Sequence, residues 1–461
     1  MDKMARVQSL LERYQQGHLL MGFEKVSKFE QDELLRTIES IDFELVEELY
    51  QGLSKGSKTS SQITISPVKS ANYKSLSDLE RTVSRLYGEK AIYDGELAVV
   101  TMAGGQGTRL GFGGPKGAFI FDKENNKSIF EALAETLKKV CDNYYVNIPW
   151  YIMCSNENIL QTRKFFSDHF YFDYPGEILF FVQGEMPMLD RSGKILLDEN
   201  YQIKMAANGH GGTLQSMERS GMIDDMKERG IKWVSINGVD NVLAKPVDPI
   251  FLGLAIMKKA KAGIKSIEKA YPEEKVGVVC LKNGRVGVVE YTEISEEMAN
   301  ERGDNGELVY GDAYALFSLF SMEGLDRISR LKLPYHAAYK KADFYNSDGQ
   351  WIAAENPNAI KFEQFIFDAY ELFDADDVCV FRTNREEEFA PIKNATGVDS
   401  PETALKLYRA YHSKKHVWYE YKLNLTQKRT VPLGAVCLFF KKLEIKLILK
   451  YNIYWIIVFW L

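Results

Sequence analysis

The sequence predicts a protein of the α/β class, with a mixed, mostly parallel sheet flanked by helices. From residue 96 to about residue 400, short apolar runs alternate with helical patterns, which is typical of such sheets. One of these runs, at 97–102, leads directly into a glycine-rich segment. The chain has 461 residues, a length that suggests two or three domains. We expect ligands beyond the carboxyl ends of the strands, where open α/β sheets bind them.

Composition and charge exclude several classes of protein. With 26% charged and 45% hydrophobic residues, the chain has the composition of a folded globular protein. A net charge of -6 gives no electrostatic reason to expect a nucleic-acid partner, so an anionic substrate has to meet local cations. The five cysteines are scattered without a C-x-x-C pair, the six histidines lack zinc-ligand spacing, and no secretory signal is visible. We therefore expect a cytoplasmic protein with reduced thiols.

The chain divides into three predicted regions. These are a helical N-terminal region over residues 1–95, a catalytic domain over 96–400 and a C-terminal region over 401–461. Apolar residues recur at helical spacing within 2–53, the stretch 54–77 is rich in serine and lysine and predicts a loop, and a helix pattern over 79–87 follows.

Apolar runs and periodicity predict the elements of the catalytic domain. The expected strands are Leu97–Met102, Trp150–Cys154, Ile178–Val182, Trp233–Asn237, Val276–Cys280 and Val286–Tyr291. The expected helices include Ile129–Cys141 and Asn158–Phe166, and a further helix pattern covers Pro401–Tyr411.

The C-terminal tail has a different character from the rest of the chain. From Leu447 it is apolar for fifteen residues, interrupted by Lys450 and Asn452, and this is short of the ~20 apolar residues of a spanning helix. Three interpretations stay open: a membrane anchor, a buried pair of strands, or a tail that is not native coding sequence. We favour the last of these and expect no membrane partner.

The segment that follows the strand at 97–102 carries the strongest functional signal. Seven of the fourteen residues at 104–117 are glycines, and the segment also carries the cations Arg109 and Lys116. Glycines let backbone N–H groups approach phosphate oxygens closely. The spacing fits neither the dinucleotide fingerprint, since Leu110 stands where a glycine is required, nor a Walker A loop, since Lys116 follows a proline. A glycine-rich turn that binds nothing is the alternative.

Two further strand ends carry side chains suited to a nucleotide. Gln183 follows the strand that ends at Val182, and its amide can both donate to and accept from the edge of a uracil. Asp240 follows the strand at 233–237 and is a candidate ligand of the Mg²⁺ that polyphosphate chemistry requires. A solvated glutamine and an Asx turn at Asp240 are the alternatives.

The glycine segment resembles the signature of sugar nucleotidyltransferases. Its motif Ala-Gly-Gly-Gln-Gly-Thr-Arg-Leu-Gly is similar to that of the UDP-N-acetylhexosamine pyrophosphorylases, which are UDPGP type 1 uridylyltransferases. Further matches are Ala-Asn-Gly-His-Gly-Gly from 207, Val-Asp-Asn from 239, Ile-Lys-x-Glu-x-Phe-x-Phe-Asp from 360 and Glu-Phe-x-Pro-x-Lys-Asn from 388. The resemblance runs from about residue 10 to 418 and ends beyond 420. It implies a Rossmann-like, GT-A-like fold with a shortened or altered C-terminal domain.

The resemblance also implies roles for individual residues. It assigns Arg109, Lys116 and Lys393 to catalysis on the phosphates, and Gly104, Gly105, Gln183, Gly209, His210 and Lys361 to the uridine nucleotide. It assigns Gly277, Glu290, Asp312, Phe365 and Phe367 to the sugar, and Asp240 to Mg²⁺ or Mn²⁺.

The implied reaction joins UTP and a sugar 1-phosphate to give a UDP-sugar and pyrophosphate, by in-line attack without a covalent intermediate. N-acetylglucosamine 1-phosphate is the leading substrate. His210 and Asp312 stand where the acetylated-sugar enzymes commonly carry asparagine, so glucose, galactose or N-acetylgalactosamine 1-phosphate stay open. An inactive uridine-nucleotide-binding protein is a third possibility, and the oligomeric state is left open.

Overall fold

The computed structural model describes residues 3–54 and 63–426, with side chains as far as residue 413. The chain forms two compact units, Met1–Leu405 and Lys406–Leu461, and apart from α13 the elements discussed below belong to the first. The predicted helix at 401–411 lies within α13 (Pro401–Thr426). The predictions for the tail fall outside the described residues. Across the described ranges, no helix is both long and apolar enough to cross a membrane.

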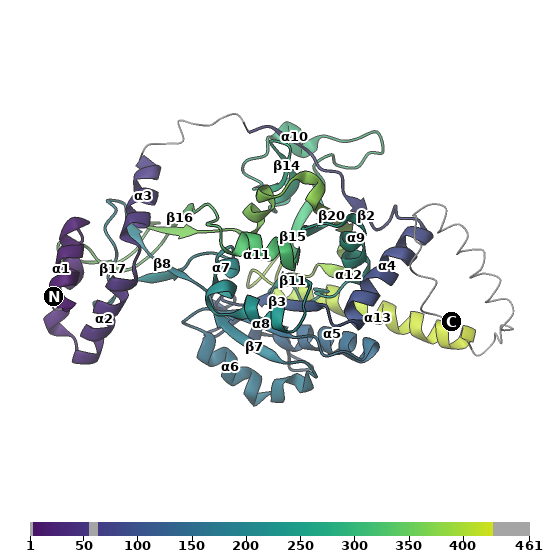
Figure 1. Cartoon of the computed structure of the whole chain (residues 1–461), viewed down its shortest axis with the longest axis horizontal. Coiled ribbons are helices and arrows are strands. Elements are labelled where there is room, and N and C mark those ends of the chain that lie inside the picture. Colours follow the sequence, from purple (N-terminus) through teal and green to yellow (C-terminus); the bar gives the residue numbers. More distant parts are fainter. Residues whose placement is uncertain (1–2, 55–62, 427–461) are drawn as a thin grey trace. The chain divides into compact units, whose positions relative to one another are not determined.

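A large mixed sheet forms the centre of the first unit (Figure 1). Its main path is β2 (Ala71–Asn72), β20 (Val378–Thr383), β12 (Ala262–Glu268), β15 (Asp312–Ser321), β11 (Trp233–Gly238), β3 (Leu97–Met102), β6 (Trp150–Cys154) and β7 (Ile178–Val182). All of these strands run parallel except β15, which is antiparallel to both of its neighbours. The predicted mixed, mostly parallel α/β sheet is therefore confirmed.

An antiparallel branch leaves this path at β15. It consists of β13 (Val278–Lys282), β14 (Arg285–Val289) and β1 (Ile65–Pro67). Smaller sheets are formed by β4 (Ile120–Asp122) with β5 (Lys127–Ser128), β8 (Glu185–Pro187) with β10 (Met205–Ala207), β17 (Phe344–Tyr345) with β18 (Trp351–Ile352), and by β16 (His336–Lys340), β19 (Ala359–Glu363) and β9 (Leu189–Asp190) together.

Three of the predicted strands match the structure residue for residue. β3, β6 and β7 have the predicted bounds, and all residues of β3 and β6 are buried. The strands β12, β15 and β20 were not predicted. β12 carries a buried lysine and serine, which interrupt the apolar run that marks a strand. The loop predicted at 54–77 is partly wrong, because β1 and β2 lie within it.

Helices flank both faces of the sheet. They are α4 (Asp78–Tyr93), α5 (Ile129–Tyr144), α6 (Ile159–Asp168), α7 (Gly212–Arg219), α8 (Met222–Glu228), α9 (Pro249–Lys258), α10 (Glu296–Asn300), α11 (Met322–Ser329) and α12 (Arg385–Glu388). On one face α7, α8 and α11 share a core cluster with Ala98 and Val100 of β3 and with Val380 of β20. On the other face Phe251 of α9 stacks on Phe381. Phe381 directly follows Val380 in β20, and successive side chains of a strand point to opposite faces of the sheet.

The N-terminal helices form a separate hydrophobic core. They are α1 (Lys3–Arg13), α2 (Lys28–Ser40) and α3 (Phe43–Ser54), so the helices predicted in this region are present. Their buried residues cluster with Leu189, Ile195 and Ile360, which belong to the smaller sheets and the loops beside them. Figure 1 accordingly shows these helices next to β8, β16 and β17, away from the centre of the large sheet. We expect them to contribute packing rather than chemistry.

Two glycines allow α4 and α9 to approach each other closely. A Cβ atom on Gly253 would lie 1.7 Å from the carbonyl oxygen of Ser84, and one on Gly88 would lie 1.9 Å from the carbonyl oxygen of Pro249. Both of these neighbours are backbone atoms, which cannot rotate away. We therefore infer that only glycine fits at this helix crossing.

Replacing Gly253 by alanine is expected to lower the free energy of unfolding by about 1–3 kcal/mol, because the added methyl group overpacks the crossing. Gly52 is the matched control, since it lies exposed in helix α3 and a Cβ atom there would have no neighbour within 4 Å. Gly52→Ala should raise stability by about 0.5–1 kcal/mol. Urea unfolding followed by circular dichroism measures both. Equal effects of the two substitutions would contradict the proposed close contact.

Candidate active site

The predicted site residues gather at one edge of the sheet. The strands β3, β6, β7 and β11 are parallel neighbours, so the loops after their carboxyl ends emerge side by side. These loops carry the glycine segment, Ser155 and Asn158, Gln183 and Asp240. The expected position of a ligand site in an open α/β sheet therefore coincides with the position of the candidate residues.

A buried asparagine holds the start of the glycine segment. Asn158 is fully buried, and its Nδ2 donates to the carbonyl oxygen of Ala103 at 3.0 Å. Its Oδ1 accepts from the backbone N–H of Ser155 at 2.9 Å. The segment also closes on itself, since Lys116 N donates to the carbonyl oxygen of Gly105 at 3.1 Å. Sequence analysis missed Asn158 because its role lies in a contact to another strand end.

Three of the residues predicted to bind uridine lie in contact. A Cβ atom on Gly104 would be 2.4 Å from Oε1 of Gln183, so a larger residue would displace the glutamine amide. Nε2 of Gln183 donates to the carbonyl oxygen of Gly209 at 2.6 Å. Gln183 is 7% exposed, and its backbone N–H donates to the carbonyl oxygen of Cys154 at 2.7 Å. The amide is thus held in one orientation at the floor of the candidate base site.

Backbone pairing joins the loop at 208–211 to residue 364. Gly211 N donates to the carbonyl oxygen of Gln364 at 2.8 Å, and Gln364 N donates to the carbonyl oxygen of Asn208 at 2.8 Å. Gly209 has φ +84°, a backbone conformation that favours glycine. A Cβ atom at this position would also lie 2.3 Å from the carbonyl oxygen of Gln364, so the close contact requires glycine as well. Gln364 is fully buried and was not predicted as a site residue.

His210 is held as a neutral imidazole by this pairing. Its Nδ1 accepts from the backbone N–H of Ile366 at 3.2 Å, so the ring proton belongs on Nε2. Burial lowers the pKa of His210 to about 4, against the opposing effect of the nearby carboxylates Asp368 and Glu363. Its ring centroid lies 5.3 Å from that of Phe365. At neutral pH His210 therefore offers one N–H donor and no charge.

Aromatic rings line the predicted sugar end of the site. Phe365 and Phe367 stack with their centroids 5.0 Å apart, and the ring of His336 lies 4.8 Å from Phe365. Nε2 of His336 pairs with Oδ2 of Asp368 at 2.8 Å, and this hydrogen bond raises the pKa of His336. Such apolar faces suit the C–H surface of a sugar ring. The predicted pair Phe365 and Phe367 is thus brought to His210.

Two other predicted sugar residues lie beside these rings. The carbonyl oxygen of Gly277 accepts a hydrogen bond from Tyr314 N at 2.8 Å, and the Tyr314 ring meets Phe367 edge to face at 6.0 Å. Burial raises the pKa of Glu290, and Glu293 raises it further, while His336 is close enough to lower it. Gly277 and Glu290 therefore belong to the same end of the site as the phenylalanine pair.

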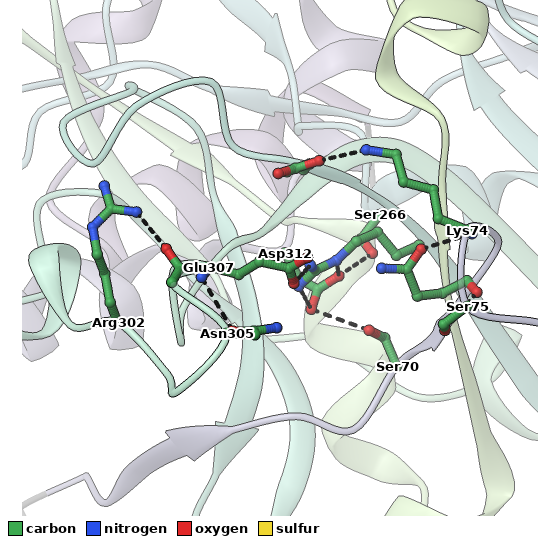
Figure 2. Close-up of polar contacts among 12 residues, drawn as sticks. Ser70, Lys74, Ser75, Ser266, Arg302, Asn305, Glu307 and Asp312 are labelled. Carbon is green, nitrogen blue, oxygen red and sulfur yellow. Dashed lines mark hydrogen bonds and ion pairs between the residues drawn. The ribbon is translucent and has the colours of Figure 1, made fainter.

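Asp312 departs from its predicted role. It is 3% exposed, and its Oδ1 accepts from Ser266 Oγ at 2.5 Å and from Arg382 Nε at 2.8 Å. Its Oδ2 accepts from Arg382 Nη2 at 2.6 Å and from Ser70 Oγ at 3.3 Å. Figure 2 shows Ser70 and Ser266 beside Asp312. All four lone-pair positions of the carboxylate are thus used, in contacts to β12, to β20 and to the segment that precedes β2. The structure gives Asp312 a structural role, and we do not retain it as a sugar ligand.

At the predicted phosphate end of the site, Lys116 pairs with the carboxylate of Asp240. Lys116 Nζ lies 3.7 Å from Asp240 Oδ2, and the two side chains are 18% and 22% exposed. Burial lowers the pKa of Lys116; Asp240 opposes this shift, and Lys393 and Arg109 add to it by repulsion. Lys116 is therefore influenced by charges from three segments, while Lys393 Nζ has a carboxylate partner of its own, Asp399 Oδ2 at 3.5 Å.

Backbone pairing between residues 240–242 and 390–392 brings Lys393 to this cluster. Ile392 N donates to the carbonyl oxygen of Asp240 at 2.8 Å, and Val242 N donates to the carbonyl oxygen of Ala390 at 3.2 Å. The side chain of Asn241 strengthens the pairing, since its Oδ1 accepts from Ala390 N at 2.8 Å. Sequence analysis treated Asn241 only as part of the motif at 239. The geometry identifies it as the link between the two loops.

Asp240 fits a divalent cation that is held mainly by phosphate. Its carboxylate makes a long contact to Lys116, which leaves oxygen lone pairs without tight pairing among the described residues. Within the described ranges, no group of three or more His, Cys, Asp or Glu side chains could hold a metal by itself. Mg²⁺ commonly takes one or two carboxylates, with phosphate oxygens and waters completing its shell.

Lys361 is placed differently from the other predicted cations. It lies in β19, and its Nζ pairs with Glu363 Oε1 at 2.8 Å. Its ion-pair partner is thus a residue of its own strand, whereas Lys116 pairs with Asp240. A role for Lys361 at the phosphates stays a prediction.

The sequence of the chain is similar to those of a known enzyme family. Residues 43–443 match the family described as UTP--glucose-1-phosphate uridylyltransferase (UDPGP). The chain is 35% identical over 433 residues to UDP-N-acetylglucosamine diphosphorylase 2 of Arabidopsis thaliana, covering 88% of this chain and 84% of that protein. It is 36% identical over 417 residues to UDP-N-acetylglucosamine pyrophosphorylase of Saccharomyces cerevisiae, covering 85% and 87%.

A solved structure shows the same fold. The structure of the uridine diphosphate N-acetylglucosamine pyrophosphorylase from Trypanosoma brucei in complex with an inhibitor superimposes with a TM-score of 0.74 at 28% identity, covering 88% of this chain and 84% of that one. The family match extends to residue 443, past residue 420, where the sequence resemblance was expected to end. The altered C-terminal domain expected from that boundary stays a prediction.

His210 should titrate with a pKa of about 4, because burial disfavours its charged form. The unfolded chain would protonate this histidine near its ordinary pKa of about 6.5. Its contribution to stability is therefore present above that value and is lost as the pH falls toward 4. NMR titration of labelled histidine, assigned with a His210→Asn variant, measures the pKa. A His210 resonance that titrates above pH 6 would contradict the assigned burial and tautomer.

Proposed function

The chain belongs to the UTP--glucose-1-phosphate uridylyltransferase family and is a nucleotidyltransferase, and on that premise we propose that it forms UDP-N-acetylglucosamine and pyrophosphate from UTP and N-acetylglucosamine 1-phosphate. One observation carries the proposal. Lys116 lies 3.7 Å from Asp240, and its charge is influenced by Arg109 of the same glycine-rich segment and by Lys393 of a distant one. Such a concentration of cations is expected where a triphosphate binds and reacts.

The other end of the glycine segment supports uridine as the base. Gly104 lies against the oriented amide of Gln183, and Gly209 accepts from that amide. We propose that the base lies on Gly104 and Gly105 and that Gln183 recognises its edge. The sugar then lies toward Gly277, Glu290, Phe365 and Phe367, so the nucleotide crosses the carboxyl edge of the sheet.

The proposed mechanism is an in-line displacement at the α-phosphorus of UTP. The attacking oxygen belongs to a sugar phosphate that is already ionised at neutral pH, so no strong general base is required. Arg109 and Lys116 hold the triphosphate, and Lys393 stabilises charge on the reacting phosphates. Asp240 would hold Mg²⁺ or Mn²⁺, which neutralises charge on the departing pyrophosphate. Lys361 is a further candidate for phosphate binding.

The choice of an acetylated sugar rests on the relatives, and His210 is compatible with it. Both curated relatives are named as UDP-N-acetylglucosamine enzymes. Because Nδ1 of His210 is occupied by Ile366, its Nε2–H is the donor left for a ligand. A neutral imidazole can thus donate one hydrogen bond where related enzymes commonly use an asparagine amide. Glucose, galactose and N-acetylgalactosamine 1-phosphates are the competing substrates.

We propose the cytoplasm as the site of this reaction. Cys141, Cys154, Cys280 and Cys379 are free and buried among the described residues, as expected for a reduced compartment. The proposed partners are UTP and the sugar 1-phosphate, without a nucleic acid or a membrane.

Pyrophosphate release from UTP, measured with a panel of sugar 1-phosphates with and without Mg²⁺, tests the proposal. We expect N-acetylglucosamine 1-phosphate to give the highest kcat/KM, and chelation of the metal to abolish release. A higher kcat/KM for glucose 1-phosphate would overturn the substrate alone. Intact UTP binding without release for any sugar would instead indicate an inactive nucleotide-binding protein.

Removing the central charges should slow turnover without unfolding the protein. Lys116→Ala and Asp240→Asn are each expected to lower kcat by about 10²–10³-fold, because each removes charge stabilisation at the reacting phosphates. Lys90→Ala is the control, since Lys90 is exposed on α4 and pairs with Asp94 of the same surface at 2.6 Å. Steady-state kinetics and melting temperature are compared for all three variants. A Lys116→Ala enzyme with near-normal kcat would refute the role of this lysine.

A further inference from the structure

Lys265 is a buried charge that the mechanism above does not use. It lies in β12 with 1% of its side chain exposed, and its ammonium sits over the rings of Phe251 and Phe317 at 5.6 and 5.1 Å. Its Nζ contacts Asp248 Oδ2 at 2.8 Å and Glu388 Oε2 at 2.7 Å. A buried ammonium costs several kcal/mol unless it is paired, so these two carboxylates explain why a lysine is tolerated here.

Two carboxylates share the ammonium of Lys265. Asp248 and Glu388 are 14% and 6% exposed, and a second lysine, Lys245, has its Nζ 3.9 Å from Glu388 Oε1 and 3.2 Å from Glu387 Oε2. Burial alone would lower the pKa of Lys265, but the two carboxylates outweigh it and raise the pKa. Removing the Lys265 charge would leave two carboxylates facing each other away from water. Both would then be driven apart or protonated.

Glu388 connects this cluster to the segment that carries Lys393. The carbonyl oxygen of Glu388 accepts from Asn241 Nδ2 at 2.6 Å, while Asn241 Oδ1 accepts from Ala390 N. The other carboxylate oxygen of Glu388 accepts from Thr383 Oγ1 at 2.5 Å, at the end of β20. Glu388 is therefore fixed at its side chain by Lys265 and at its backbone by the loop of Asp240.

Asp248 connects the same lysine to the other end of the Asp240 loop. Its Oδ1 caps α9 by accepting from Ile250 N at 3.0 Å and from Phe251 N at 3.3 Å. The chain between β11 and α9 therefore carries Asp240 near its start and a partner of Lys265 at its end. One ammonium thus bridges the two loops that supply Asp240 and Lys393.

We propose that Lys265 is a positioning residue for uridylyl transfer, which holds the segment 388–393 against the Asp240 loop and so sets the distance between Lys393 and Asp240. The inference rests on the proposed roles of Asp240 and Lys393. It does not involve the uridine end, because Gly104 and Gln183 are held by other contacts. Loss of Lys265 should therefore affect turnover more than nucleotide binding.

Lys265→Met tests the proposal, with two readouts. We expect kcat to fall by about 10–100-fold through misplacement of Lys393, while calorimetric affinity for UTP changes by less than about threefold. Hydrogen exchange followed by mass spectrometry should show faster exchange in peptides covering Ala390 and Ile392, whose N–H groups pair with the Asp240 loop, and unchanged exchange in β6. Lys227→Met is the control, because Lys227 pairs with Asp326 between α8 and α11, outside both loops.

A second variant keeps the proposal testable if Lys265→Met does not fold. Glu388→Met leaves the Lys265–Asp248 pair intact and removes the side-chain contacts of Glu388 to Lys265, Lys245 and Thr383, so the same losses in kcat and protection are expected. Wild-type kcat together with wild-type exchange at Ala390 and Ile392 in a folded variant would overturn the positioning role. If the wild-type chain releases no pyrophosphate, the proposed function fails, and exchange alone then decides whether Lys265 fixes the segment.

Discussion

The backbone pairing of residues 240–242 with residues 390–392 is the contact on which the candidate site depends. It brings Lys393, which follows β20, to Asp240, which follows β11, although β12 and β15 separate these two strands in the sheet. Arg109, Lys116 and Lys393 repel one another, so their mutual attraction cannot assemble the site. The sheet and the loop pairing hold them in place, and the pKa of Lys116 is lowered chiefly by burial and further by the charges of Lys393 and Arg109.

The site is therefore built from two ends with different physical requirements. At the proposed uridine end the main requirement is space, because Gly104 leaves room for the amide of Gln183 and Gly209 leaves room for the backbone of Gln364. At the phosphate end, charge dominates, and the supporting contacts are buried ion pairs and an asparagine that bonds to two backbone positions. Burial keeps His210 neutral, and its Nδ1 accepts a hydrogen bond from Ile366 N. Its ring lies close to the rings of Phe365 and Phe367.

Much of the fold and of the site could be predicted because the signals are local. β3, β6 and β7 are continuous apolar runs, and Gln183 follows one of them directly. β12 could not be predicted, because Lys265 and Ser266 are buried by partners far along the chain. For the same reason the prediction for Asp312 did not anticipate Arg382, a partner from another strand that occupies its carboxylate.

The sequence by itself determined the α/β class, the glycine-rich segment that follows β3 and the family to which its motifs point, since these depend on the order of neighbouring residues. Tertiary structure alone decided which charges meet. It placed Lys116 beside Asp240, gave Asp312 to an ion pair with Arg382, and buried Lys265 between two loops. Charge pairing acts through space over a few ångströms, so residues far apart in the chain reveal it only once the strands are arranged.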